Sequence, residues 1–255
     1  MRIYRYKHEN KTAYGVLKDE FLYRIEGPIF RKFRITNQKI PIAEATLLPP
    51  TKPSKIVAVG ANYRNHALEM GRRLPEEPMI FLKPPSAVIG PNDIIVYPKM
   101  AKRVDYEGEM AFVIRREARL LGQDDETDSY ILGYTCFNDV TARDLQERDG
   151  QFTRAKSFDT FAAVGPCIAT DIDPSQLRLK TFVNGKLRQS AHTRSLIFPV
   201  PFLLRFISNI MTLNPGDIIT TGTPAGVGPL SPGDRVDIQI EGIGTLSNIV
   251  MKIKR

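Results

Sequence analysis

Two glutamates two residues apart, Glu107 and Glu109, stand at the head of an apolar run that extends from Met110 to Ile114. Because a strand directs alternate side chains to the same face, we expect both carboxylates to project together from a strand that enters the core. Burying two like charges is costly, and a cation between them removes much of that cost. A third acid, Asp139, ends a second apolar segment. Three oxygen ligands with positions left for water or substrate suit Mg²⁺, Mn²⁺ or Ca²⁺, so we predict a divalent-metal site; a solvated strand face is the alternative.

A histidine and a glutamate form the second candidate group. His66 and Glu69 are three residues apart in a short helix that we predict between Asn62, as the N-cap, and Gly71. Residues at this spacing share a helix face, and a carboxylate beside an imidazole raises its basicity. The pair could therefore act as a general base on water; an exposed polar pair with no role is the alternative.

A lysine and a glycine-rich loop form the remaining candidates. Lys156 lies close in sequence to Phe158 and Phe161, and its ammonium could meet a substrate carboxylate or a developing enolate. A surface lysine is the alternative. The glycines of residues 220–228 would allow the backbone to approach a ligand, although their spacing does not match the dinucleotide-binding fingerprint. A purely structural turn remains open for this loop.

The pattern of short apolar segments predicts the elements that must position these residues. Residues 1–48 show the alternation of short strands, and the proline-rich stretch 49–54 indicates a boundary. Asn184-Gly185 predicts a hairpin turn, and residues 140–148 and 200–213 have helical patterns. Strands outnumber helices and no regular βαβ alternation occurs, so we predict an α+β, mainly β fold with a mixed, strongly curved sheet. We divide it into a small N-terminal domain at 1–50 and a catalytic domain at 55–255.

Bulk composition limits the function classes. The chain of 255 residues is 42% apolar and carries a net charge of +8, but its Lys and Arg residues are scattered and match no nucleic-acid-binding motif. We therefore expect no nucleic-acid partner, although a non-catalytic anion- or nucleic-acid-binding protein remains the alternative from a different class. We also expect no membrane association, because no apolar segment reaches about 20 residues. The N-terminal sequence shows no export signal, and we interpret the two cysteines as reduced core residues. Both observations predict a cytoplasmic protein.

Taken together, the motifs resemble the fumarylacetoacetate hydrolase (FAH) family. From about Ser54 onward they occur in the family's order: Gly60-Ala61-Asn62-Tyr63 with His66 and Glu69, then Asp105-Tyr106-Glu107-Gly108-Glu109, Phe137-Asn138-Asp139 followed by Arg143, Lys156-Ser157-Phe158-Asp159, and finally Gly222 to Gly228. The resemblance implies the family's mixed β-roll, a homodimer, and a Mg²⁺ or Mn²⁺ cofactor held by Glu107, Glu109 and Asp139. It further implies catalytic roles for His66, Glu69 and Lys156, and substrate contacts by Arg143, Gln146 and Thr223.

The resemblance also implies a reaction class. The substrate would be a 2-oxo acid such as an acylpyruvate, and water activated by His66 and Glu69 would cleave a C–C bond to release a pyruvate enolate stabilised by the metal and Lys156. Decarboxylation of oxaloacetate and isomerisation of unsaturated 2-hydroxy or 2-oxo dioic acids such as hydroxyhepta-diene-dioate use the same enolate. The motifs do not separate these outcomes. The presence of both His66 and Glu69 favours the hydrolase.

Overall fold

The computed structural model of the chain describes residues 1–69 and 73–253, leaving aside the side chains of residues 66–68. Strands make up most of the regular structure, and the sheets contain both parallel and antiparallel pairs. This confirms the predicted α+β, mainly β fold.

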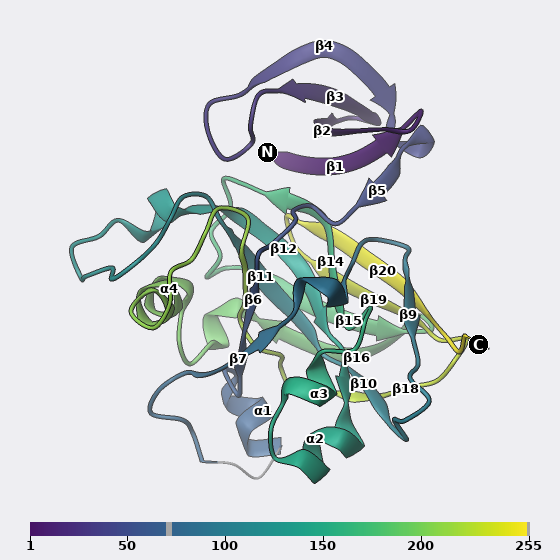
Figure 1. The fold of residues 1–255 in the computed structure, drawn as a ribbon, viewed down its shortest axis with the longest axis vertical. Coiled ribbons are helices and arrows are strands. Elements are labelled where there is room, and N and C mark those ends of the chain that lie inside the picture. Colours follow the sequence, from purple (N-terminus) through teal and green to yellow (C-terminus); the bar gives the residue numbers. More distant parts are fainter. Residues whose placement is uncertain (70–72, 254–255) are drawn as a thin grey trace.

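The N-terminal strands form a layer of their own at the top of Figure 1. It is an antiparallel meander of β1 (Arg2–His8), β2 (Lys11–Lys18), β3 (Phe21–Glu26) and β4 (Arg34–Pro41), with β5 (Thr46–Leu48) paired back onto β1. β1 joins the rest of the sheet at its first two residues, where Arg2 pairs with Ala169 and Ile3 with Ile168. The short strands predicted before the proline-rich stretch are therefore confirmed.

Three strands that are buried along their whole length form the centre of the molecule. They are β11 (Gly108–Ile114), β12 (Ile131–Asp139) and β14 (Ala162–Ala169). Burial on both faces explains why their sequences are apolar without a regular alternation. The sheet continues from β11 through β17 (Ile218–Thr220) to β6 (Ile56–Gly60) and β7 (Met79–Lys83), while β8 (Val88–Ile89) pairs with β14.

A second sheet packs against the central strands. Its order is β16 (Lys186–His192), β15 (Arg178–Val183), β19 (Arg235–Ile240), β20 (Gly244–Met251) and β9 (Ile94–Val96). Buried and exposed positions alternate along β19 and β20, so one face is apolar; β15 meets β11, β19 meets β12, and β20 meets β14. The predicted hairpin is confirmed: Asn184 and Gly185 have φ angles of 51° and 74°. A small third sheet joins β13 (Thr141–Ala142), β10 (Val104–Tyr106) and β18 (Gly228–Leu230).

The helices are short, and three of them gather at the end of the molecule opposite the N-terminal strands (Figure 1). These are α1 (Arg64–Glu69), α2 (Arg143–Asp149) and α3 (Thr153–Lys156); α4 (Val200–Ser208) lies to one side, and single 3₁₀ turns occupy Ile42–Glu44, Pro85–Ala87, Thr127–Tyr130 and Thr193–Ser195. Among the residues that the structure describes, no helix combines the length and apolar character that crossing a bilayer requires.

Three predicted helix boundaries need correction. α2 begins at Arg143 rather than at Val140, because Thr141–Ala142 first pairs with β10. α4 ends at Ser208, earlier than predicted. Asn62 does not cap α1: its side chain accepts from Phe198 N and donates to Phe198 O and Thr221 O, so it joins three loops instead. The predicted end of α1 at Gly71 lies outside the described residues.

Candidate metal centre

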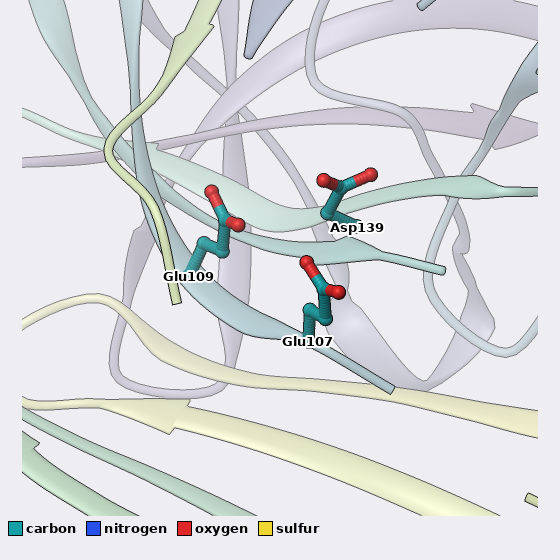
Figure 2. A group of neighbouring side chains, drawn as sticks. All are labelled: Glu107, Glu109 and Asp139. Carbon is teal, nitrogen blue, oxygen red and sulfur yellow. The ribbon is translucent and has the colours of Figure 1, made fainter. Parts of the chain in front are cut away.

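The antiparallel pairing of β11 with β12 brings the three acidic residues together. Glu109 is paired with Phe137, and Asp139 N donates to Glu107 O at 2.9 Å, so Glu107 and Asp139 stand opposite each other across the ladder. Glu109 lies two residues further along the same face. One carboxylate oxygen from each residue lies within 4.8 Å of the others, and Figure 2 shows the three side chains on the same side of the strands. Three buried carboxylates at this spacing can share one divalent cation.

Glu109 is the member of the trio whose charge is least compensated. It accepts a hydrogen bond from Gly222 N at 2.9 Å and, among the described residues, forms no ion pair with a lysine or arginine. Burial, followed by the negative charges of Asp139 and Glu107, raises the pKa of Glu109 well above its usual range. A bound Mg²⁺ or Mn²⁺ would supply the missing positive charge, so the donor set fits the predicted metal in number, type and charge.

Two buried lysines neutralise the other carboxylates. The Nζ atom of Lys156, at the end of α3, lies 2.8 Å from Glu107 Oε2 and 2.6 Å from Asp139 Oδ2. Lys83 Nζ, at the end of β7, donates to the second oxygen of Asp139 and to Val140 O at 3.3 Å. Both lysine residues are at most 2% exposed, so the surface-lysine reading of Lys156 is wrong.

The two ammonium groups differ electrostatically. Burial alone lowers the pKa of Lys156, but the carboxylates of Asp139 and Glu107 outweigh it and raise the pKa above its ordinary value. For Lys83 burial dominates and lowers the pKa, with Lys156 adding to the effect and Asp139 opposing it. Lys156 is therefore the firmer positive charge at the site.

Sequence reasoning missed Lys83 and the role of Asp105. Lys83 follows the apolar residues 79–82 directly and precedes Pro84, a weak signal that a charge ends a buried strand. Asp105 is fully buried and accepts from Arg143 Nε at 2.9 Å and from Arg103 Nε at 2.8 Å. Its position two residues before Glu107 could have indicated a third inward-facing acid.

Arg143, predicted to contact substrate, is occupied by protein groups. Its Nε binds Asp105, one terminal nitrogen donates to Glu107, and the other donates to Gln146. Burial works against ionisation, yet the Glu107 and Asp105 carboxylates raise the pKa of Arg143 above its ordinary value. Arg143 therefore holds Glu107 in place. Of the two residues predicted to contact substrate from α2, Arg143 is buried and Gln146 is only partly buried.

The predicted glycine-rich loop closes the site beside Glu109. Thr223 Oγ1 donates to Gly108 O at 3.0 Å, so its proton is used within the protein. Tyr106 Oη donates to Gly226 O at 2.8 Å. Gly226 N lies 3.1 and 3.2 Å from the two carboxylate oxygens of Glu69, which attaches the loop to α1. The side chain of His66 lies outside the described residues, so its predicted pairing with Glu69 stays a prediction.

A cavity of about 40 Å³ lies above the carboxylates. Both polar and apolar residues line it. The polar residues are Glu107, Glu109, Asp139, Arg143, Gln146, Lys156 and Thr223, and the others are Val59, Gly60, Ala61, Met79, Phe81 and Phe152. This volume is enough to hold water, which needs about 10–15 Å³ of such space.

Comparison with known families and proteins agrees with this geometry. A family profile described as the C-terminal domain of fumarylacetoacetate (FAA) hydrolase matches residues 55–251, and one described as Rv2993c-like, N-terminal, matches residues 1–50. The oxaloacetate tautomerase YisK of Bacillus subtilis is 45% identical over 214 residues, which cover 78% of this chain and 71% of that protein.

Two solved structures connect the fold to related chemistry. A crystal structure of 5-carboxymethyl-2-hydroxymuconate delta-isomerase from Mycobacterium smegmatis superimposes with a TM-score of 0.93 at 43% identity, covering 99% of this chain and 100% of the other. A maleylpyruvate hydrolase from a Sphingobium species, in complex with manganese and pyruvate, gives a TM-score of 0.82 at 31% identity and covers 100% of both chains.

Proposed function

Because the chain belongs to the fumarylacetoacetate hydrolase family, we propose that it is a divalent-metal-dependent enzyme that converts 2-oxo acids through an enolate. The observation that carries the proposal is the trio Glu107, Glu109 and Asp139, buried on one face with Lys156 bridging two of its members. A Mg²⁺ or Mn²⁺ ion on this trio would act as a Lewis acid toward the carbonyl of a substrate.

The protein's own groups would bind and stabilise an anion. The carboxylates of Asp139 and Glu107 raise the pKa of Lys156, so its ammonium stays charged, and Lys156 lines the cavity. It can donate a hydrogen bond to the oxygen that gains charge as a proton leaves the neighbouring carbon. Gln146 also lines the cavity and can donate to a substrate carboxylate, while Arg143 keeps Glu107 oriented.

The reaction that requires the fewest catalytic groups is proton transfer between the keto and enol forms of a 2-oxo dioic acid. A C3–H bond breaks, the proton passes to a base, and a proton returns to the oxygen. The family relative named oxaloacetate tautomerase supports this choice. The apolar side chains of Met79, Phe81 and Phe152, which line the cavity, would exclude water around the reacting carbon.

Hydrolytic C–C cleavage of an acylpyruvate is the second candidate. It is favoured by the spacing of His66 and Glu69 on α1 and by the pyruvate complex of the hydrolase from Sphingobium. Here His66, oriented by Glu69, would remove a proton from water, and the water oxygen would attack the distal carbonyl. The bond to C3 would then break, leaving its electron pair on the enolate and releasing the acyl group as a carboxylic acid.

Proton exchange into deuterated water tests the step common to both reactions. With pyruvate or 2-oxobutanoate and Mg²⁺ or Mn²⁺, the wild-type protein should wash out the C3 protons, as followed by NMR. Glu107→Gln should abolish the exchange, whereas Glu117→Gln, which changes an exposed glutamate beyond β11, should not. Wild-type protein that leaves the C3 protons in place would refute the enolate. A second panel of oxaloacetate, acylpyruvates and unsaturated dioic acids then separates tautomerase, decarboxylase, hydrolase and isomerase.

A homodimer in the cytoplasm completes the proposal. Phe202 and Ile210, in and just after α4, are 44% and 54% exposed, and they line one surface groove with Leu121 and Phe206, which gives an apolar surface that a second copy could cover. Light scattering coupled to size exclusion should give twice the mass of one chain. A monomer at micromolar concentration would contradict the dimer.

A further inference from the structure

A buried side-chain amide lies behind the acidic trio. Gln189, in β16, is 1% exposed, and its Oε1 accepts a hydrogen bond from Gly108 N at 3.0 Å. Its Nε2 donates to Thr223 Oγ1 and to Pro224 O, both at 2.8 Å. Thr223 Oγ1 in turn donates to Gly108 O at 3.0 Å. The three residues form a closed ring in which both peptide groups of Gly108 take part.

The position of Gly108 gives this ring its importance. Gly108 lies between Glu107 and Glu109, so the orientation of its two peptide planes decides where both carboxylates point. A Cβ atom on Gly108 would lie 2.1 Å from Thr181 Oγ1 of the same hairpin, so the hairpin β15–β16 rests directly on this backbone. Residue 108 has to be glycine for that contact to exist.

The same hairpin also supports the glycine-rich loop. A Cβ on Gly226 would lie 2.3 Å from Arg188 O, the residue before Gln189. The loop contacts Glu109 through Gly222 N at 2.9 Å and Glu69 of α1 through Gly226 N at 3.1 Å. Gln189 thus connects the segment that carries Glu107 and Glu109 with the glycine-rich loop, and this loop in turn contacts α1.

We propose that Gln189 is a positioning residue: it fixes the separation of Glu107 and Glu109 and holds the loop 223–226 against them, so that the trio is set for a divalent ion. Only a carboxamide can fill this position, because it offers one acceptor to Gly108 N and two donors to the loop. A glutamate would lose both donors and add a charge beside three acids. The consequence for catalysis rests on the proposed function, whereas the consequence for metal binding does not.

Manganese affinity, measured by calorimetry or by EPR of free Mn²⁺, tests the inference. Gln189→Leu keeps the volume and removes every hydrogen bond, and it should weaken Mn²⁺ binding by about 10- to 100-fold, the usual effect of losing a group that orients metal ligands. The matched control is Asn248→Leu. Asn248 is a buried amide that bridges Gly90 O at 2.9 Å and Asp93 O at 2.8 Å, and it belongs to no part of the site. Its substitution should lower the melting temperature and leave the Mn²⁺ affinity unchanged.

Thr223 provides a second route that does not depend on how well Gln189→Leu folds. Thr223→Val breaks the ring and should weaken Mn²⁺ binding, whereas Thr223→Ser keeps the hydroxyl and should retain wild-type affinity. Because both residues act in one ring, Gln189→Leu with Thr223→Val should cost no more than the larger single effect.

Three results would overturn the proposal: wild-type Mn²⁺ affinity in folded Gln189→Leu, equal losses in Gln189→Leu and Asn248→Leu, or equal affinities in Thr223→Val and Thr223→Ser. Failure of the proposed function looks different. If the wild-type protein exchanged no C3 protons but the Mn²⁺ affinities followed the expected pattern, the proposed enolate chemistry would be refuted and the positioning role of Gln189 would be supported.

Discussion

Replacing Lys83 by methionine should destabilise the metal-free protein. Lys83 is fully buried and donates to Asp139, whose other oxygen is 2.6 Å from Lys156. Methionine fills the space of the lysine stem but leaves one oxygen of a buried carboxylate without its cation.

The structure sets the size of this effect. Removing one partner of a buried ion pair costs about 3–5 kcal/mol. Since Lys156 still faces Asp139, the lower end applies, about 3 kcal/mol. In a protein of this size each kcal/mol shifts the melting temperature by about 2–4 °C, which predicts a fall of about 6–12 °C.

Thermal and urea denaturation in the presence of a chelator measure the loss, with Lys102→Met as a control at an exposed lysine. Adding Asp139→Asn to Lys83→Met should recover part of the stability, because the uncompensated charge disappears. Saturating Mn²⁺ should also stabilise Lys83→Met more than the wild type, since the ion replaces the missing cation. A Lys83→Met protein as stable as the wild type without metal would refute the reasoning that Lys83 neutralises Asp139.

Four further predictions concern the site and its support. Glu107→Gln should abolish both turnover and the rise in melting temperature that Mn²⁺ produces in the wild type. His66→Ala should keep Mn²⁺ binding but reduce acylpyruvate hydrolysis, measured by steady-state kinetics, by about 10²- to 10⁴-fold. Because the pKa of Glu109 is raised, the folded metal-free protein holds a proton that the unfolded chain has lost. The stability of the metal-free protein therefore falls as pH rises from the ordinary carboxyl pKa to the raised pKa. Mn²⁺ binding weakens as pH falls through the raised pKa, because the ion must displace the proton. Calorimetry of Mn²⁺ binding in two buffers should detect a proton released by the wild type and none released from this position in Glu109→Gln. For Asp217, burial opposes ionisation, but Lys55 Nζ at 2.5 Å and four further donors hold its pKa below the usual range. Urea titrations should therefore show stability lost as pH falls through that lowered pKa, and Asp217→Asn should lose about 3 kcal/mol.

Periodicity within a single strand was enough to predict two members of the acidic trio. The two-residue spacing of Glu107 and Glu109 determines that they share a face, whatever the neighbouring strands are. That Asp139 joins them depends on the antiparallel register, which places it opposite Glu107. Its position at the end of a second apolar segment, together with the motif order, indicated this third member. The hairpin at Asn184-Gly185 was equally local, since the turn residues dictate it.

The supporting residues could not be predicted because each depends on contacts between distant segments. Lys83 and Gln189 meet Asp139 and Gly108 across separations of 56 and 81 residues. Neither lies in a pattern that distinguishes it from an exposed polar residue on a strand. For the same reason the sequence left a surface position open as the alternative for Lys156, since burial of a lysine follows from its partners and not from its neighbours in sequence. The division into domains at 1–50 and 55–255 stays a prediction.

Anomalous scattering from crystals soaked in manganese tests the central claim most directly. One peak should appear between the carboxylates of Glu107, Glu109 and Asp139, within about 2.0–2.3 Å of an oxygen from each. A well-ordered site with no peak among these three residues, or a manganese ion held by other side chains, would contradict the account.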